Sequence, residues 1–448
     1  MSELIATNQV TAIVGAGVTG LSVARFLVRQ ARPFVIFDTR TDLPSAAAIR
    51  EEFGSAALQL GALDAETLAL AHQVVVSPGV PLSTPALVHA AEAGVPLLGD
   101  IELFARHARA PIVAITGSNA KSTVTTLVAD MALRAGIRVA VGGNLGVGAL
   151  DLLDEKVQLY VLELSSFQLE SVQKLNATVA CVLNVSADHM DRYPNLGAYH
   201  AAKLRIFYGA QHLVVNQRDV LTQPPLAVGV KPIGFGGPAE FNNFGVLERD
   251  GETWLAWQFE PLLPASALKI KGTHNVDNAL AALAIGHAAG LKLDVMVEAL
   301  RAFTGLPHRC QWVAQHAGVD YFNDSKATNV GATLAAIEGL AADYPQLVLI
   351  AGGEGKGADF APLASAVQSH VRAAVLMGAD APRLADALSG AAPVVRAADM
   401  PNAVRQASAQ ARSGDAVLLS PACASFDMFS NYEDRGRAFC AAVEELSA

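Results

Sequence analysis

The sequence predicts an α/β protein of three domains, in which helices cover parallel β-sheets. Apolar segments of strand length alternate along the chain with Ala-rich segments of helical length, a pattern typical of parallel sheets with helices on their faces. Two of the turns between a strand and a helix have the composition of nucleotide-binding loops. The chain has 448 residues, of which 52% are hydrophobic and 17% charged. That length is enough for about three domains, each with its own core.

The N-terminal unit opens with a strand, a glycine-rich turn, a helix and a second strand. We expect these elements at residues 10–14, 15–20, 21–30 and 34–37, and a further strand at 74–76. The turn reads Gly15-x-Gly17-x-x-Gly20 and Asp38 ends the second strand, which fits the dinucleotide-binding pattern. Such a turn lets a pyrophosphate approach the N-terminus of the helix. The pattern therefore fits NAD(P) and another nucleotide, such as UDP, equally well.

The central unit follows a junction at residues 96–100 and contains the second nucleotide-binding turn. A buried strand at 112–115 enters a short polar loop, and a helix begins with Lys121 and Ser122. Backbone N–H groups and the positive end of the helix dipole converge at such a turn. Lys121 would reach the outer phosphates of a nucleoside triphosphate, and Ser122 would help to hold Mg²⁺. Because Ile115 and Ala120 replace the two glycines of the standard P-loop pattern, a chance Lys-Ser at a strand-to-helix turn is the alternative interpretation.

The rest of the central unit predicts more strands and three candidate ligand-binding side chains. Strands are expected at 139–141, 160–164, 179–184 and 213–216, a hairpin at 248–257, and helices from residue 101 and at 275–290 and 293–302. Glu163 ends a strand at the edge of the sheet where ligands bind, which makes it a plausible Mg²⁺ ligand. His189 lies in a polar loop, where it is either a metal ligand or merely exposed. Lys203 lies on a helix, and its spacing alone indicates only a solvated lysine.

The C-terminal unit follows a break at Gly305-Leu306-Pro307 and alternates again. Its strands are expected at 347–350, 374–377, 394–396 and 416–420. Polar loops of this unit contain Arg309, Lys326 and Lys356, cations well suited to bind phosphates and carboxylates. Each of these loops is also compatible with ordinary turn chemistry.

Composition excludes several classes of function. The formal net charge is −10 and no Lys/Arg tract compensates it, which argues against general binding to nucleic acids or anionic membranes. The four cysteines lie far apart with no C-x-x-C pair, so neither a zinc site nor a disulfide framework is expected. The N-terminus lacks a signal segment, and the longest apolar runs are Ala-rich helices. We therefore expect a soluble cytoplasmic protein without membrane insertion.

These motifs together resemble the Mur ligases, the ATP-dependent amide-bond-forming enzymes of peptidoglycan precursor synthesis. The resemblance runs nearly end to end and is carried by TGSNAKST, LELSSFQL, NVSADHMDRY, YHAAK, GTHNVDNALAA, GLPHR, NDSKATN, GGEGK and SPACASFD. The last four, with GAGVTG and DTR near the N-terminus, are most similar to the branch that adds D-glutamate to UDP-N-acetylmuramoyl-L-alanine. The resemblance implies a Rossmann-like UDP-binding domain at 1–99, a P-loop ATP-binding domain at 100–304 and a dinucleotide-fold domain for the amino acid at 305–448.

The resemblance also implies roles for individual residues. The ATP site would comprise Gly117, Ser118, Asn119, Ala120, Lys121, Ser122, Thr123, Asn275, Asn278, Arg309 and Asp324. The UDP-linked substrate would contact Val18, Thr19, Asp38, Thr39, Arg40 and Gly79, with Asn144 and Ser165 at its muramoyl-alanine end. D-Glutamate would lie among Lys326, Thr328, Lys356, Ser425 and Phe426. Of two Mg²⁺ ions, one would bind Ser122 and Glu163, the other His189 and a carbamylated Lys203. The catalytic group would be Lys121, His189, Lys203, Lys326 and Lys356.

The resemblance leaves alternatives and two departures from the family pattern. The chain would act as a monomer on small molecules. Another Mur-type ligase with a different amino acid, or a folylpolyglutamate synthase, is the nearest alternative, although a full UDP-type N-terminal domain disfavours the synthase. An NAD(P)-binding oxidoreductase or regulator with a vestigial P-loop is the alternative from another class. Ala120 stands where the family has glycine, and Tyr432 where a phenylalanine is expected beside D-glutamate.

Overall fold

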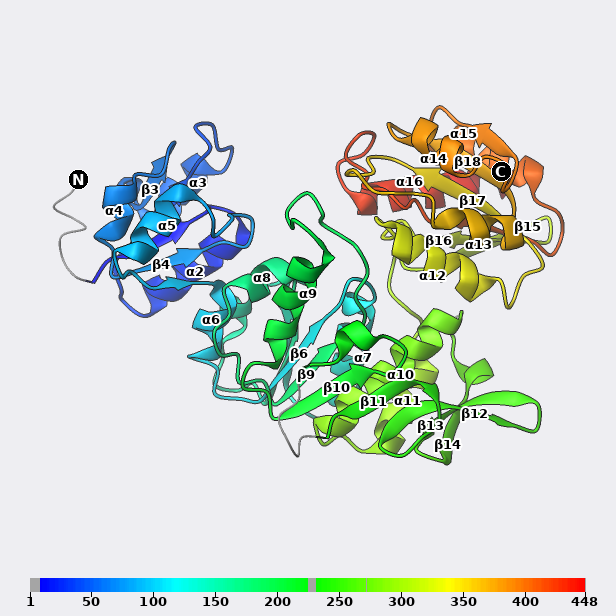
Figure 1. Cartoon of the computed structure of the whole chain (residues 1–448), viewed down its shortest axis with the longest axis horizontal. Coiled ribbons are helices and arrows are strands. Elements are labelled where there is room, and N and C mark those ends of the chain that lie inside the picture. The colour runs from blue at the N-terminus through cyan, green and yellow to red at the C-terminus, as the bar shows by residue number, and fades with distance from the viewer. Residues whose placement is uncertain (1–8, 225–230, 271, 448) are drawn as a thin grey trace.

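Three β-sheets follow one another along the chain, each built from one contiguous stretch of sequence. The structure is a computed structural model that describes residues 9–224, 231–270 and 272–447. The N-terminal and C-terminal units lie on either side of the central unit (Figure 1). The three-domain α/β architecture predicted from the sequence is confirmed. No helix in the described part of the chain is long and apolar enough to cross a membrane.

The N-terminal sheet has five parallel strands in the order β3-β2-β1-β4-β5. The strands are β1 (Thr11–Val14), β2 (Phe34–Asp38), β3 (Leu58–Leu60), β4 (Gln73–Val76) and β5 (Leu97–Leu98). Its helices are α2 (Val18–Arg29), α3 (Ala46–Phe53), α4 (Ala65–Ala69) and α5 (Pro85–Glu92). Buried residues of α2 and α3 pack on one face, and those of α4 and α5 on the other. The expected βαβ opening is therefore present, with a helix that begins three residues earlier than predicted.

The central sheet has nine strands in the order β14-β13-β12-β11-β10-β9-β6-β8-β7. The parallel strands are β6 (Ile112–Thr116), β7 (Val139–Gly143), β8 (Leu159–Glu163), β9 (Val179–Val182), β10 (His212–Asn216), β11 (Ile233–Pro238) and β12 (Asn243–Arg249). Strands β13 (Glu252–Trp257) and β14 (Glu260–Pro264) continue the sheet in antiparallel fashion. The expected hairpin turns at Asp250-Gly251, whereas β11 and β14 were not predicted.

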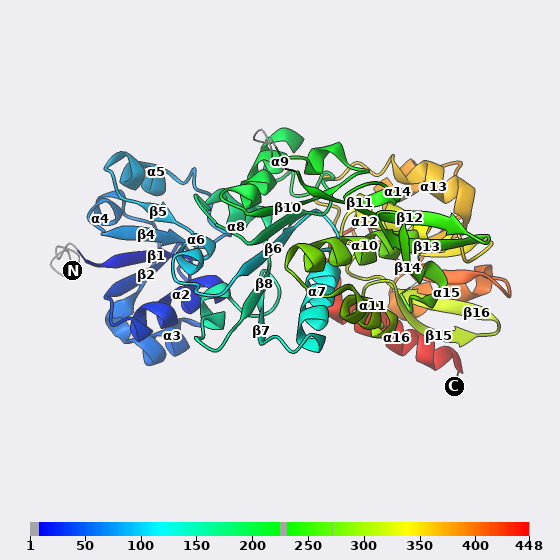
Figure 2. The same ribbon diagram turned by 90° about the horizontal axis from the view of Figure 1, so that it is seen from below.

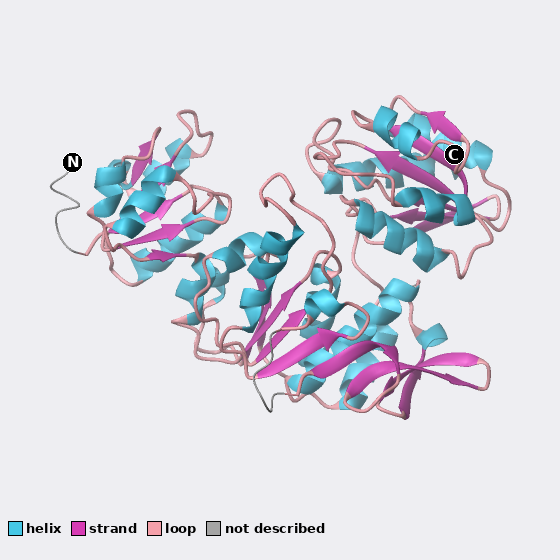
Figure 3. Cartoon of the chain, in the orientation of Figure 1, coloured by secondary structure: helices cyan, strands magenta, loops and turns pink. Residues whose placement is uncertain are grey.

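Helices cover both faces of the central sheet (Figures 2 and 3). Helices α7 (Lys121–Arg134), α10 (Thr273–Ala288) and α11 (Leu293–Ala302) share one buried cluster with the strands. On the other face lie α6 (Asp100–Ala105), α8 (Ser166–Glu170) and α9 (Leu196–Leu204). The cluster on that second face also contains residues of β1 and α2, so the first two units share one continuous core.

The C-terminal sheet has six strands in the order β15-β16-β20-β17-β18-β19. They are β15 (Gln311–His316), β16 (Val319–Asn323), β17 (Leu347–Gly352), β18 (Val371–Met377), β19 (Val394–Arg396) and β20 (Ala416–Leu419). Helices α12 (Val330–Leu340), α13 (Leu363–His370) and α14 (Ala381–Ala387) pack on one face, and α15 (Met400–Gln410) and α16 (Tyr432–Glu444) on the other. All four expected strands are present. The sheet is parallel as expected except at its edge, where β15 pairs antiparallel with β16.

Candidate active site

The P-loop connects β6 to α7 and is held by hydrogen bonds to the neighbouring β9 loop. The N–H groups of Ser118 and Asn119 donate to the carbonyl and the side-chain oxygen of Asn184, at 2.9 and 2.8 Å. Lys121 folds back over the loop, and its Nζ donates to the carbonyls of Gly117 (2.8 Å) and Ser118 (3.0 Å). Burial lowers the pKa of Lys121, and the nearby Glu163 and Asp188 act in the opposite direction. A lysine held in this way is placed to bind an anion at the start of α7.

Ala120 caps helix α7 in the left-handed conformation, with φ of 66°. A non-glycine residue in this region is strained by contact between its Cβ and the backbone. The turn therefore does need a positive φ at this position, and alanine adopts it.

Changing Ala120→Gly is expected to raise the free energy of unfolding by no more than about 1 kcal/mol, because relief of strain is partly offset by a more flexible unfolded chain. Activity should stay unchanged. Ala120→Val should destabilise the protein, because a β-branched side chain fits the left-handed region worse than alanine. Thermal unfolding of the three proteins checks this, and a valine variant as stable as the original would contradict the strain argument.

A cavity of about 300 Å³ lies where the central and C-terminal units meet at the P-loop. It brings together side chains from distant parts of the sequence. Its predicted lining residues are Ser118, Asn119, Ala120, Lys121, Ser122, Asn144, Glu163, Ser165, His189, Lys203, Arg309, Lys326 and Thr328. Of the further lining residues, Tyr199 was missed although it lies one helical turn before Lys203, a spacing that places both on one face of α9.

Two hydrogen bonds join different segments that line this cavity. The Asn144 amide donates to Oε1 of Glu163 at 2.6 Å, while Oε2 of Glu163 is buried and accepts no hydrogen bond within the described part of the chain. Arg309, from the C-terminal unit, donates to Oγ of Ser122 at 2.6 Å. Burial lowers the pKa of the Arg309 guanidinium, which Glu163 and Asp324 counteract. An unpaired carboxylate oxygen beside a serine hydroxyl is a donor set that suits Mg²⁺.

Lys203 is among the most deeply buried side chains of the protein, with 1% of its surface exposed. Its Nζ donates to the carbonyl of Gly117 at 2.8 Å and lies 4.5 Å from the centroid of the Tyr199 ring. Burial, with the nearby Lys121 charge, lowers the pKa of Lys203 well below its usual value. The interpretation as a solvated lysine is therefore wrong. A neutral buried amine is nucleophilic, as carbamylation by CO₂ requires.

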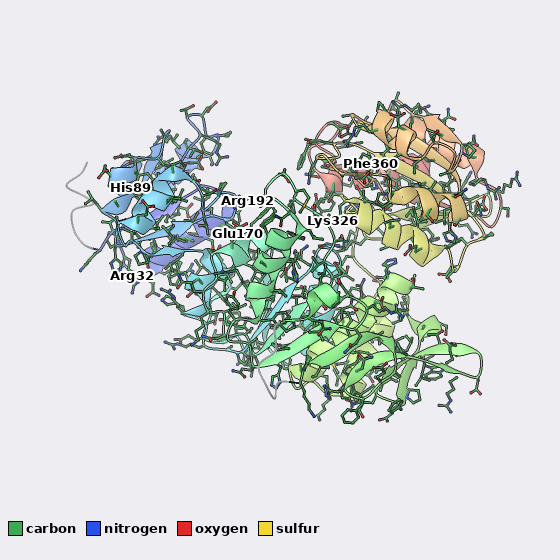
Figure 4. The ribbon with its side chains drawn as sticks, viewed as in Figure 1. Arg32, His89, Glu170, Arg192, Lys326 and Phe360 are labelled. Carbon is green, nitrogen blue, oxygen red and sulfur yellow. The ribbon has the colours of Figure 1, made fainter. Side chains whose placement is uncertain are left out.

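His189 lies in the loop between β9 and α9 with a positive φ of 57°. Its Nε2 is 3.7 Å from Oδ2 of Asp188, its ring packs edge-on against Phe167 at 4.8 Å, and burial lowers its pKa. Arg192 fastens the same loop to α8, because it bonds Glu170 at 2.8 Å and lies 5.0 Å from the centroid of Phe167. Figure 4 shows Glu170 and Arg192 close together.

The described residues contain no group of three or more His, Cys, Asp and Glu side chains that could hold a metal ion. The four expected ligands include only one histidine and one carboxylate. An unmodified Lys203 would not serve as the second ligand beside His189, since an ammonium group repels a cation. The donor set thus fits the expected ions only if Lys203 carries the carbamate, an oxygen-donor anion.

A second cavity of about 400 Å³ continues from the P-loop along α10 and α12. The expected ATP residues that line it are Asn119, Ala120, Thr123, Asn275, Asn278, Arg309 and Asp324. Its wall also contains Asn216 and Phe235, which carried no recognisable sequence signal, and His274 and Asp277, which lie in the GTHNVDNALAA motif but were not singled out. Burial raises the pKa of Asp324 to about 7, although hydrogen bonds from Ser420 Oγ (2.9 Å) and the Cys310 N–H (3.1 Å) oppose the shift.

The expected D-glutamate residues are only partly brought together. Thr328 and Lys356 line a third cavity of about 540 Å³, which also reaches His189. Lys326 lies between the central and C-terminal units (Figure 4), 3.6 Å from the centroid of the Tyr432 ring. Burial lowers the pKa of Lys326 to about 8. Ser425 and Phe426 line none of these three cavities, since Ser425 is buried and Phe426 is 68% exposed.

The remaining expected residues surround the glycine-rich turn of the N-terminal unit. Gly15 has φ of 103°, and a Cβ on Gly20 would lie 1.9 Å from the Gly15 carbonyl oxygen, so glycine is required at both positions. Asp38 accepts hydrogen bonds from the Ala16 N–H (2.8 Å) and from Arg40 (2.7 and 2.8 Å). The Arg40 hydrogen bond, with that from Ala16, lowers the pKa of Asp38 to about 2. The other expected residues at this site are solvent-accessible: Val18, Thr19, Thr39 and Gly79.

Comparison with known proteins gives one consistent result. Residues 9–99, 115–286 and 308–423 match three families, described as "Mur ligase MurD-like, N-terminal domain", "Mur ligase middle domain" and "Mur ligase, glutamate ligase domain". Over 447 residues the chain is 58% identical to the UDP-N-acetylmuramoylalanine–D-glutamate ligase of Pseudomonas aeruginosa, covering 99% of this chain and 100% of the relative. It is 52% identical over 456 residues to the enzyme of that name from Saccharophagus degradans, with 100% of both chains covered.

Solved structures show the same fold at low sequence identity. A pseudomurein peptide ligase type C from Methanothermus fervidus has a TM-score of 0.61 at 17% identity, covering 98% of this chain and 100% of that one. A UDP-N-acetylmuramate-alanine ligase from Thermotoga maritima has a TM-score of 0.58 at 18% identity, with the same coverage.

Proposed function

The chain belongs to the Mur ligase family, and on that premise we propose that it joins D-glutamate to UDP-N-acetylmuramoyl-L-alanine in a reaction driven by ATP. The observation that carries this proposal is the end-to-end identity of 58% to a ligase of that substrate pair. The cavity at the P-loop supports it, because it gathers a phosphate-binding lysine, an unpaired carboxylate and further cations at one place. ATP-dependent formation of an amide bond needs each of these.

We divide the chain into a UDP-binding domain at 1–99, an ATP-binding domain at 100–304 and an amino-acid-binding domain at 305–448. Each division falls between two of the three sheets. The proposed reaction uses only small molecules and free ATP, so we place it in the cytoplasm and propose that the protein acts as a monomer.

The proposed reaction has two steps. A carboxylate oxygen of the alanine attacks the γ-phosphorus of ATP, giving an acyl phosphate and ADP. The D-glutamate amine then attacks the acyl carbon, and the tetrahedral intermediate collapses to an amide and inorganic phosphate. In the first step Lys121 and Arg309 bind phosphate oxygens and hold them in line with the attacking carboxylate. Asn144 and Ser165 orient the muramoyl-alanine end.

The amino acid enters from the side of the C-terminal domain. Lys326, Thr328 and Lys356 would bind its carboxylates, and Ser425 and Phe426 would have to approach on domain closure. Ser122 with Glu163, and His189 with carbamylated Lys203, would hold two Mg²⁺ ions. When bound, these ions neutralise charge on the phosphates. Closure of the domains excludes water that would hydrolyse the acyl phosphate.

Release of phosphate from ATP tests the function directly. With UDP-N-acetylmuramoyl-L-alanine present, D-glutamate should raise phosphate release well above the background, and L-glutamate and other D- and L-amino acids should not. Release with a different amino acid would favour another Mur-type ligase. Calorimetry should detect binding of the UDP-linked substrate and none of NAD(H) or NADP(H), because the second nucleotide site at Lys121 favours a nucleotide-linked substrate at the N-terminal turn. Tight dinucleotide binding would support the oxidoreductase alternative.

A further inference from the structure

Helix α6 joins the N-terminal unit to the central unit and packs directly against α8. A Cβ on Gly99, just before α6, would lie 2.0 Å from Oγ of Ser171 at the end of α8, so the two segments approach closely at this glycine. Ile101 and Phe104 of α6 belong to the buried cluster that continues from the N-terminal unit into the central one. The junction is therefore tightly packed, and it contacts α8, the helix that begins at the cavity beside the P-loop.

A short chain of hydrogen bonds runs from this junction to the cavity. Oδ2 of Asp100 accepts from Nε2 of Gln168 at 3.2 Å. Oε1 of Gln168 accepts from the Ser165 N–H at 3.1 Å and from its hydroxyl at 3.3 Å, while Oγ of Ser165 caps α8 by accepting from the Gln168 N–H at 3.2 Å. Asp100 and Gln168 are 2% and 3% exposed and do not line the cavity, whereas Ser165 does.

The carboxylate of Asp100 holds the NH₂ end of the Gln168 amide, while Ser165 holds its oxygen. A side-chain amide has one end that donates and one that accepts. An ionised carboxylate can only accept, so it holds the NH₂ end and leaves the oxygen for Ser165. Burial raises the pKa of Asp100 to about 6, so above that pH the side chain is this acceptor. Without it, the NH₂ group loses this acceptor, and among the described residues the Gln168 side chain is held by its hydrogen bonds to Ser165 alone.

We propose that Asp100 is a positioning residue for the muramoyl-alanine end of the substrate, acting through Gln168 on Ser165. The inference rests on the proposed function, in which Ser165 contacts that part of the substrate. Because Asp100 also begins the central unit, it fixes this serine relative to the unit that would bind UDP. One substrate molecule is thereby aligned across two domains.

Calorimetry with two ligands separates positioning from general damage. Asp100→Leu, which removes the acceptor at similar size, should raise the Kd of UDP-N-acetylmuramoyl-L-alanine by about tenfold or more and leave the Kd of UDP alone unchanged. Asp100→Asn keeps an acceptor and should stay within about threefold of the original protein. Kinetically, the KM for the UDP-linked substrate should rise in the leucine variant while the KM for ATP does not.

Exchanging the carboxylate and the amide between positions 100 and 168 tests the chain of hydrogen bonds without introducing an apolar side chain. Gln168→Glu alone places two carboxylates face to face and should weaken binding of the full substrate. Adding Asp100→Asn gives an amide that donates to the new carboxylate, whose other oxygen still accepts from Ser165. The double variant should therefore recover affinity to within about threefold of the original protein. The comparison of the single Gln168→Glu variant with the double variant still tests the inference if Asp100→Leu fails to fold.

Glu102 provides the matched control on the same helix. Its Oε2 accepts from the N–H groups of Gln173 and Lys174 at 2.9 and 3.0 Å, but it has no bond to Gln168. Glu102→Leu should lower the melting temperature without changing the Kd of the full substrate. Equal loss of affinity in the Asp100→Leu and Glu102→Leu variants, or no recovery in the double variant, would overturn the inference. If the unaltered protein binds UDP but not UDP-N-acetylmuramoyl-L-alanine, the proposed function fails first and this inference fails with it.

Discussion

Replacing Lys121 by alanine is expected to lower kcat by about a thousandfold or more, because the proposed first step transfers a phosphoryl group whose charge this ammonium neutralises. The amine lies over the P-loop, 2.8 Å from the Gly117 carbonyl and 3.0 Å from that of Ser118. Both contacts are hydrogen bonds to neutral carbonyl groups. An incoming phosphate can replace them with a stronger, charge-assisted hydrogen bond to the Lys121 ammonium. The loss should therefore fall on phosphoryl transfer rather than on the stability of the loop.

The UDP-linked substrate should still bind to the Lys121→Ala variant, because its nucleotide is proposed to bind in another domain. Calorimetry with this substrate should give a Kd within about threefold of the original protein, while phosphate release is lost. Lys292, an exposed lysine that precedes α11, serves as the control, and its replacement by alanine should leave both measurements unchanged. If Lys121→Ala keeps more than a few per cent of the activity, the P-loop assignment is wrong.

Lys203→Arg is expected to be inactive at any bicarbonate concentration, which is the second large effect. Arginine keeps a positive charge but cannot carry a carboxylate. The Mg²⁺ ion proposed to bind His189 and carbamylated Lys203 would therefore lose one of its two protein ligands. Its guanidinium must also fit where a single amine now donates to Gly117 at 2.8 Å and is 1% exposed. The arginine side chain thus differs from the carbamate in its charge, in its ability to bind the metal ion and in its volume.

The carbamate itself has a distinct dependence on pH and CO₂. It forms from the neutral amine, and burial lowers the pKa of Lys203, so more of the reactive form is present at a given pH than for an exposed lysine. As pH falls the amine protonates, so activity in CO₂-depleted buffer should fall with it and return on addition of bicarbonate. Lys203→Ala should also be inactive, with partial recovery when a small carboxylic acid fills the gap. An active arginine variant, or an unmodified amine beside two bound Mg²⁺ ions in a crystal structure, would refute the assignment.

Much of the fold was predictable because it depends on local patterns. The alternation of strands with Ala-rich helices correctly indicated largely parallel sheets covered by helices, and the break at Gly305-Leu306-Pro307 lies between two sheets. The expected junction at 96–100 instead contains β5 (Leu97–Leu98), a strand of the N-terminal sheet. The β15–β16 hairpin was missed: β15 shows little burial contrast, β16 is mostly buried, and their antiparallel direction is set by pairing at the sheet edge. Strand direction is a property of non-local pairing and has no local signal.

The candidate site divides in the same way. Turn chemistry is local, so the P-loop with Lys121 and Ser122 and the Gly15–Gly20 turn could be recognised from the sequence alone, since both depend on residues adjacent in the chain. The environment of Lys203 could not be recognised, because the Gly117 carbonyl that receives its hydrogen bond is 86 residues away. The bond between Arg309 and Ser122 spans 187 residues and exists only because two domains meet. Sequence by itself determined the architecture and the nucleotide-binding turns; the tertiary structure alone decided which side chains lost their water, and with it the charge and reactivity of Lys203.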